Sequence, residues 1–134
     1  MSNQEPRKQF VNWLIKKARR DKRIWLLTGD LGFNFIEPFA KEFPDRFINC
    51  GIAEQNMIGV ATGLKLLGWE PYVYSNAVFL NYKCIEQIRS AAFQRIKLNI
   101  VGTQANEFLG ASHNLQKWEK EPLKLLKGIN YIKL

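Results

Sequence analysis

Among the side chains of the types that acid–base chemistry uses, Glu54 and His113 stand out by their positions. Glu54 falls in the first turn of a predicted helix whose other residues are mostly apolar or small. Burial there would oppose ionisation of the carboxyl, whereas the positive end of the helix dipole would favour it. The position equally suits a carboxylate that caps the helix and faces water, so both interpretations stay open.

His113 is the only histidine, so the chain offers no pair of histidines for a metal site. It stands in a predicted loop with glycine and serine, where a lone imidazole is either a surface residue or a group that contacts a ligand. Cys50 and Cys84 stand in no CxxC pattern, which predicts reduced thiols and no zinc site. The sequence therefore predicts no metal ligands and leaves His113 as a candidate catalytic residue.

Further polar residues follow the predicted strands. Gly29–Gly32 follows the first strand, Gly51–Asn56 the second, Ser75–Asn76 the third and Thr103–Asn114 the fourth. Ligands of open α/β sheets bind beyond the carboxyl ends of the strands, so we expect these four segments to converge on one site. Gly29–Gly32 is a weak phosphate loop, because it lacks both the GxGxxG spacing and the Lys-Ser/Thr pair of a P-loop.

The elements that would position these residues alternate along the chain. Apolar spacing and turn residues predict helices over 6–20, 36–42, 54–68, 79–93 and 123–127, and strands over 24–28, 46–49, 71–74, 98–102 and 131–134. The third helix reads as long and buried, and Gly68 closes it. Phe79 and Tyr82 on the fourth helix would by default be core aromatics. The alternation predicts a three-layer α/β/α fold with a mostly parallel sheet.

Length and charge limit the class of protein. The chain has 134 residues and a mass of 15.6 kDa, which suits one domain. The net charge of +8 is concentrated at the two ends, +6 over residues 1–24 and +3 over residues 117–134, so the middle is nearly neutral. This distribution favours solvated helix faces or a docking surface for an acidic partner over nucleic-acid binding. No apolar run approaches the roughly 18 residues of a membrane span, and the charged start is unlike a signal peptide, which predicts a cytoplasmic protein.

The sequence from about Trp25 to His113 resembles the transketolase family. The stretches that carry the resemblance are Phe43–Asn56, Gly59–Leu64, Tyr74–Leu80, Glu86–Arg89 and Gly110–His113. The chain looks like the pyrimidine-binding domain of a transketolase, in particular of the split type whose N-terminal and C-terminal sections are separate chains. The resemblance implies one thiamine-diphosphate-binding domain over residues 1–134, with the diphosphate-binding and C-terminal domains absent from it.

The resemblance also implies roles for four residues. Glu54 matches the glutamate that hydrogen-bonds N1′ of the thiamine diphosphate aminopyrimidine, favouring the imino tautomer whose 4′-nitrogen removes the thiazolium C2 proton. Phe79 matches the aromatic residue that stacks on the pyrimidine. His113 resembles the histidine that contacts the sugar near the reacting carbon. Asp30 resembles an acidic residue that approaches the cofactor from the domain interface.

Some positions depart from the family pattern. Glu107–Gly110 stands where related enzymes carry Gly-Glu-Asp-Gly, and Tyr82 or Lys83 takes the place of a polar residue that faces substrate. The Gly-Asp-Gly motif with a following Asn, which holds Mg²⁺ and the diphosphate, is missing. In this family that site lies on another domain. The resemblance therefore implies a homo- or hetero-oligomer in which a diphosphate-binding transketolase subunit holds the Mg²⁺ and the substrate is a sugar phosphate or related sugar.

Three other interpretations remain. The chain could be a non-catalytic interaction module that keeps the fold and docks a partner through its basic ends. A deoxyxylulose-phosphate synthase or a 2-oxoacid dehydrogenase β-subunit would share the glutamate. A nucleic-acid binder rests on net charge alone. We rank transketolase first, because Glu86–Arg89 and the spacing from Tyr74–Ser75 to Phe79 look closer to split transketolases.

Overall fold

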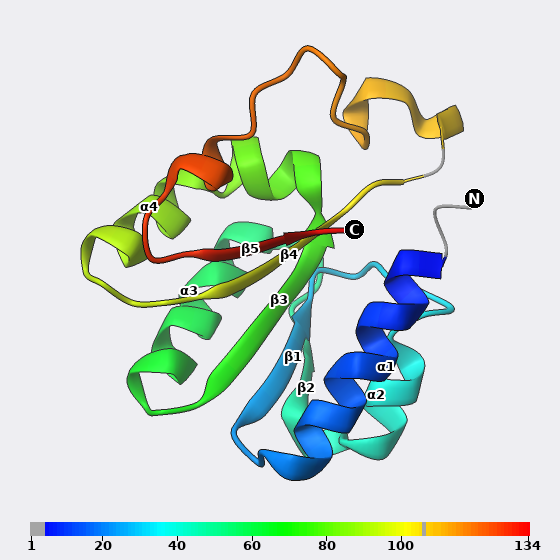
Figure 1. The fold of residues 1–134 in the computed structure, drawn as a ribbon, viewed down its shortest axis with the longest axis vertical. Helices are drawn as coiled ribbons and strands as arrows, with labels where there is room; N and C mark the ends of the chain where they lie inside the picture. Colours follow the sequence, from blue (N-terminus) through cyan, green and yellow to red (C-terminus); the bar gives the residue numbers. More distant parts are fainter. Residues whose placement is uncertain (1–4, 106) are drawn as a thin grey trace.

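Five short strands form one sheet in the order β2-β1-β3-β4-β5 (Figure 1). The computed structural model describes residues 5–105 and 107–134. The strands are β1 (Ile24–Thr28), β2 (Phe47–Asn49), β3 (Glu70–Asn76), β4 (Asn99–Thr103) and β5 (Asn130–Lys133). Every neighbouring pair is parallel, so all five carboxyl ends point to the same edge of the sheet.

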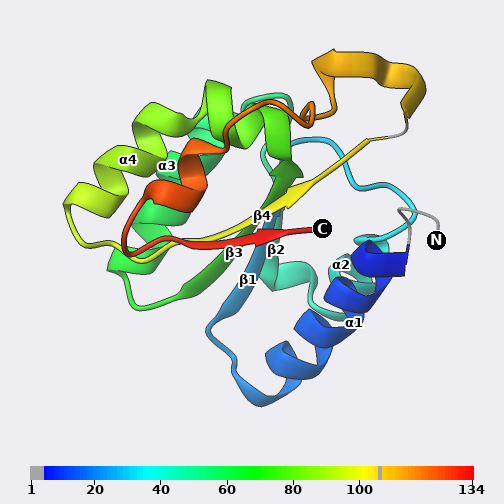
Figure 2. The same ribbon diagram turned by 45° about the horizontal axis from the view of Figure 1, so that its top comes forward.

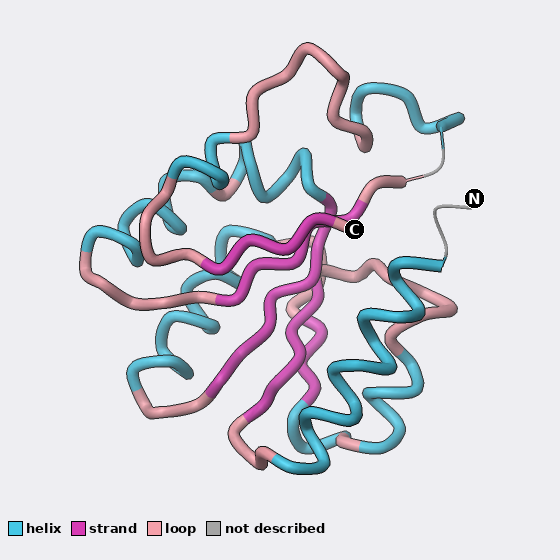
Figure 3. Tube along the Cα trace, in the orientation of Figure 1, coloured by secondary structure: helices cyan, strands magenta, loops and turns pink. Residues whose placement is uncertain are grey.

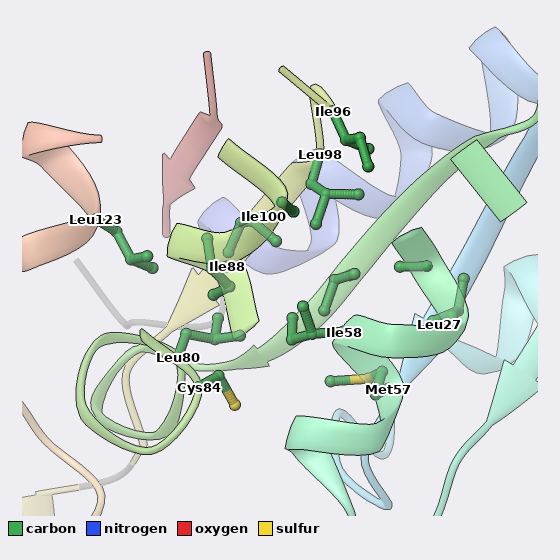
Figure 4. Close-up of a cluster of buried hydrophobic side chains, with 13 residues drawn as sticks. Leu27, Met57, Ile58, Leu80, Cys84, Ile88, Ile96, Leu98, Ile100 and Leu123 are labelled. Carbon is green, nitrogen blue, oxygen red and sulfur yellow. The ribbon is translucent and has the colours of Figure 1, made fainter. Parts of the chain in front are cut away.

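Helices cover both faces of this sheet (Figures 2 and 3). They are α1 (Glu5–Arg20), α2 (Glu37–Glu42), α3 (Glu54–Leu66) and α4 (Ile85–Phe93). α1 and α2 bury Phe10, Leu14 and Phe39 against one face. α3 and α4 bury Met57 and Ile88 against the other, within the cluster drawn in Figure 4. The predicted three-layer α/β/α fold is confirmed. No helix among the described residues is long and apolar enough to cross a bilayer.

The central strand is longer than its apolar run predicts. β3 extends to Asn76 because β4 pairs with it from Tyr72 to its last residue, up to the pair Asn76–Thr103. Ser75 and Asn76 are therefore buried strand residues rather than loop residues. The longer strand fixes the Asn76 side chain at the edge where the predicted site lies.

Three predicted helices need correction. α3 is buried on one face only, since it forms an outer layer and buries just Glu54, Met57, Ile58 and Ala61. The helix predicted over 79–93 is interrupted by a π-helical turn, Phe79–Lys83, in which the Cys84 N–H donates to the Phe79 carbonyl at 3.0 Å. The helix predicted over 123–127 is a single 3-10 turn, Pro122–Leu125.

Gly102 on β4 is required by close packing, and we expect Gly102→Ala to destabilise the fold. A Cβ there would lie 2.8 Å from the Tyr131 hydroxyl oxygen and 3.2 Å from the Ala77 Cβ. Overpacking of this kind costs about 1–3 kcal/mol of unfolding free energy, measured by urea denaturation. Gly59→Ala is the matched control, because Gly59 lies inside α3 with no atom within 4 Å of its Cβ position. It should stabilise the chain by about 0.5–1 kcal/mol, and a loss of stability at both sites would contradict the packing argument.

Candidate functional site

The four site residues predicted from the sequence line one pocket at the carboxyl edge of the sheet. This pocket has a volume of about 340 Å³ and is lined by Asp30, Glu54, Phe79 and His113, among other residues. All four predicted polar segments contribute to it, from the loops after β1, β2 and β4 and from the end of β3. Asn106, within the last of these segments, lies outside the described residues. The predicted convergence of the segments is therefore confirmed.

Glu54 is the buried acid of the pocket. It is the first residue of α3, and only 2% of its surface is exposed. Its Oε2 accepts a hydrogen bond from Lys83 Nζ at 2.8 Å. The loop after β1 packs closely on the Glu54 side chain at Gly29. A Cβ at Gly29 would lie only 3.3 Å from Glu54 Cγ, so the absence of a side chain there allows the contact. The alternative in which Glu54 faces water as a helix cap is wrong.

Phe79 forms an aromatic wall of the same pocket. Its ring is half-buried, so the default expectation of a core aromatic is wrong. The His113 ring meets it edge-to-face, with 5.2 Å between the ring centroids and 69° between the planes. This is a favourable aromatic geometry. The contact brings together a helical turn and a loop that are far apart in the sequence.

The loop that carries His113 is held in place by side chains. Asn76 Nδ2 donates to the His113 carbonyl at 2.6 Å, and Asn76 Oδ1 accepts from the Val78 N–H at 2.9 Å. His113 Nδ1 lies 2.9 Å from Ser112 Oγ. Gly110 bends the preceding 3-10 turn with a φ of 58°. His113 is half-buried against Phe79 rather than free on the surface, and its Nδ1 is already engaged.

Asp30 lies at the exposed rim of the pocket, and Asn49 ties its loop to the end of β2. Asn49 Oδ1 accepts from the backbone N–H groups of Asp30 at 2.9 Å and Gly51 at 3.0 Å. Asn49 Nδ2 donates to Asp30 Oδ1 at 3.2 Å. Asp30 has a φ of 55°, a left-handed conformation that Asp tolerates better than most residues. Sequence reasoning missed Asn49, although its place at the end of a predicted strand was a signal.

Two more pocket residues were not predicted, Arg7 and Tyr74. Tyr74 is fully buried, and its hydroxyl has no hydrogen-bond partner within the described structure. Burial raises the pKa of this hydroxyl to about 12, so it stays protonated at neutral pH. Its place near the end of the third predicted strand could have indicated a site residue. Arg7 lies in the first helix, and nothing in its local pattern pointed to the pocket.

The two neighbouring residues Tyr82 and Lys83 point in different directions. Tyr82 is 46% exposed and donates its hydroxyl proton to the Lys120 carbonyl at 2.8 Å. Lys83 donates to Glu54, and this hydrogen bond raises the pKa of the lysine above its usual range. The pair therefore stabilises the fold at neutral pH, and this contribution is lost when the pH rises through the raised lysine pKa.

The two thiols take no part in this arrangement. Cys84 is fully buried in the core between the sheet and α4, and burial raises the pKa of its thiol to about 12 (Figure 4). Burial also raises the pKa of Cys50. Thiolates are the reactive form, so both groups are poor nucleophiles at neutral pH.

The pocket has the parts that would hold a flat aromatic heterocycle. Phe79 offers an aromatic face, and the Glu54 carboxylate in the same pocket can accept or give a proton at a ring nitrogen. Glu54 Oε2 is engaged by Lys83, whereas Oε1 accepts no hydrogen bond from residues 5–105 or 107–134. One carboxylate oxygen is thus available to a ligand. An aminopyrimidine ring fits this donor and acceptor set.

Comparison with known proteins gives one family. The family described as "Transketolase, pyrimidine binding domain" matches residues 3–118. A putative transketolase C-terminal section from Methanocaldococcus jannaschii is 38% identical over 114 residues, which is 81% of this chain and 36% of the relative. An apulose-4-phosphate transketolase subunit from Phocaeicola vulgatus is 36% identical over 113 residues, again 81% of this chain and 36% of the relative.

A full-length relative and a solved structure agree with this result. Human transketolase is 37% identical over 106 residues, covering 78% of this chain and 17% of the human protein. A solved structure described as a split gene transketolase, inactive beta4 tetramer, superposes with a TM-score of 0.68 at 35% identity. It covers 85% of this chain and 37% of that one. The chain thus spans about a third of the length of the first two relatives and of the solved structure.

Proposed function

The chain belongs to the family of transketolase pyrimidine-binding domains, and on this premise we propose that it is the pyrimidine-binding part of a transketolase-like enzyme. The enzyme would transfer a two-carbon ketol unit between sugars. The family implies dependence on thiamine diphosphate. The observation that carries the proposal is that the buried Glu54 carboxylate and the Phe79 ring line one pocket.

Each site residue has a proposed role. Thiamine diphosphate, when bound, supplies a carbon nucleophile at its thiazolium ring. Glu54 would hold a proton between its carboxylate and N1′ of the aminopyrimidine, and its burial shields that proton from water. Phe79 would stack on the pyrimidine. His113, placed by Asn76 and Phe79, would orient the sugar, and Asp30 would approach the cofactor from the pocket rim.

The active enzyme would need a second domain. We propose that a diphosphate-binding transketolase subunit holds the Mg²⁺ and the diphosphate, and that the two parts form a homo- or hetero-oligomer with a sugar phosphate or related sugar as substrate. The proposal is supported by two relatives whose names describe parts of an enzyme, one a C-terminal section and the other a transketolase subunit. The cytoplasmic location of this chain stays a prediction.

Calorimetric titration with thiamine diphosphate and Mg²⁺ tests this function. The chain should bind the cofactor in the presence of a diphosphate-binding transketolase section and much more weakly without it. Ketol transfer should then appear only in the mixture. If the chain binds no cofactor either with or without the diphosphate-binding section, the enzyme interpretation is rejected and the non-catalytic interaction module is favoured.

A further inference from the structure

Lys83 occupies a place that the activity described above does not use. Its ammonium lies 2.8 Å from Glu54 Oε2 and 5.5 Å from the centroid of the Phe79 ring. It therefore contacts both residues that would meet the pyrimidine. Within residues 5–105 and 107–134, it is the one cation within ion-pair distance of Glu54.

A carboxylate as buried as Glu54 needs such a partner. Only 2% of the Glu54 side chain is exposed, and an unpaired charge in that setting is strongly unfavourable. The Lys83 side chain is 48% exposed, so its ammonium remains partly hydrated while it neutralises the buried group. The pair thus gives the buried group a cationic partner without the full cost of burying a lysine.

The turn that carries Lys83 is rigidly anchored. Lys83 ends the π-helical turn that Phe79 begins, so both side chains come from one element. Asn81, in the middle of the turn, is fully buried. Its Nδ2 donates to the Ala77 carbonyl at 2.9 Å, and its Oδ1 accepts from the Leu123 N–H at 3.1 Å. These bonds fix the turn, and functional groups on fixed elements hold their geometry best. π-helical turns are frequent at functional sites.

We propose that Lys83 is a positioning residue that orients the Glu54 carboxylate by holding Oε2 and leaves Oε1 for the aminopyrimidine nitrogen. This inference rests on the proposed function and adds a residue to its site.

Lys83→Met tests the inference, with Lys83→Arg as the conservative variant. In the complex with a diphosphate-binding section, Lys83→Met should lower kcat at saturating thiamine diphosphate by about tenfold, as expected for coupled neighbours. Lys83→Arg should restore most of kcat. Lys65→Met is the matched control, because Lys65 pairs with Glu70 from the C-terminal end of α3 and lies outside the pocket. It should leave kcat unchanged.

A second measurement needs only the chain itself. Urea unfolding of wild type, Lys83→Met, Glu54→Gln and the double variant gives the coupling between the two side chains, and we expect clearly non-additive effects. In [¹³Cε]-lysine NMR, the pKa of Lys83 should fall in Glu54→Gln, since the hydrogen bond that raises it is weakened.

The outcomes separate the two proposals. If the wild-type complex is active and Lys83→Met has the same kcat, the proposed role of Lys83 is wrong, whereas the proposed function is unaffected. Additive unfolding energies would overturn the role of Lys83 even if the complex were inactive. A wild-type complex that neither binds cofactor nor transfers ketol units would overturn the proposed function, whatever Lys83 does.

Discussion

Glu54→Gln should abolish turnover in the complex of this chain with a diphosphate-binding transketolase section. The substitution keeps the shape of the side chain but removes the carboxyl group that we propose holds a proton at the cofactor nitrogen. Loss of a positioned acid–base group costs about 10²–10⁴-fold in rate. Glu54 also sits in a water-poor position, with 2% of its surface exposed, so bulk water is a poor substitute. Single-turnover and steady-state ketol transfer would measure the loss.

The control for this variant is Glu70→Gln. Glu70 also pairs with a lysine, Lys65, but it is partly exposed and lies at the start of β3, at the opposite end of the sheet from the pocket. Circular dichroism should show that both variants keep the fold. Retained activity in Glu54→Gln would mean that the motif Gly51–Asn56 has been misread, whereas equal loss in both variants would indicate a general effect of removing an ion pair.

The layers of the fold could be predicted because they depend on patterns of apolar residues within short segments of the sequence. Apolar runs such as Ile24–Thr28 are continuous, as expected for strands buried on both faces, and they alternate with helical spacing. Parallel strands then bring their carboxyl ends to one edge, so the meeting of Asp30, Glu54 and Phe79 followed from topology. The resemblance to transketolases agreed with this arrangement and supplied the roles.

The details of the site depend on contacts between distant residues, which local patterns do not contain. The π-helical turn is one example: Asn81 is held by Ala77, Tyr131 and Leu123, the last two about 40–50 residues away. The break at Cys84 and the approach of Lys83 to Glu54 follow from that anchoring. Periodicity alone therefore predicted one straight helix and could not choose between Tyr82 and Lys83.

Which side of a helix faces water likewise depends on tertiary packing. α3 contains enough small and apolar residues to read as buried throughout. No other layer of the described structure covers its outer face, and Leu66 is 70% exposed. Glu54 shows the reverse case. It could equally have capped the helix in water, and it is buried because the β1 loop, with Gly29, packs directly on it. No local rule distinguishes these two outcomes.

Phe79→Ala should weaken the binding of thiamine diphosphate to the complex by about 10–100-fold. The ring is half-buried at the pocket and would supply both apolar contact area and a stacking face. Losing such a contact costs roughly 1.5–3 kcal/mol of binding free energy, which corresponds to that change in Kd. Because His113 packs edge-to-face on the same ring, turnover should fall as well. Titration of the complex with the cofactor measures Kd.

Phe93→Ala is the matched control, since Phe93 ends α4 with 85% of its surface exposed and lies outside the pocket. It should leave Kd unchanged. Phe79→Leu separates stacking from bulk: leucine fills much of the same space without an aromatic face, so affinity should stay below wild type if stacking contributes. Wild-type affinity in Phe79→Ala would show that the pyrimidine does not stack on Phe79, because removal of a stacking partner should raise Kd.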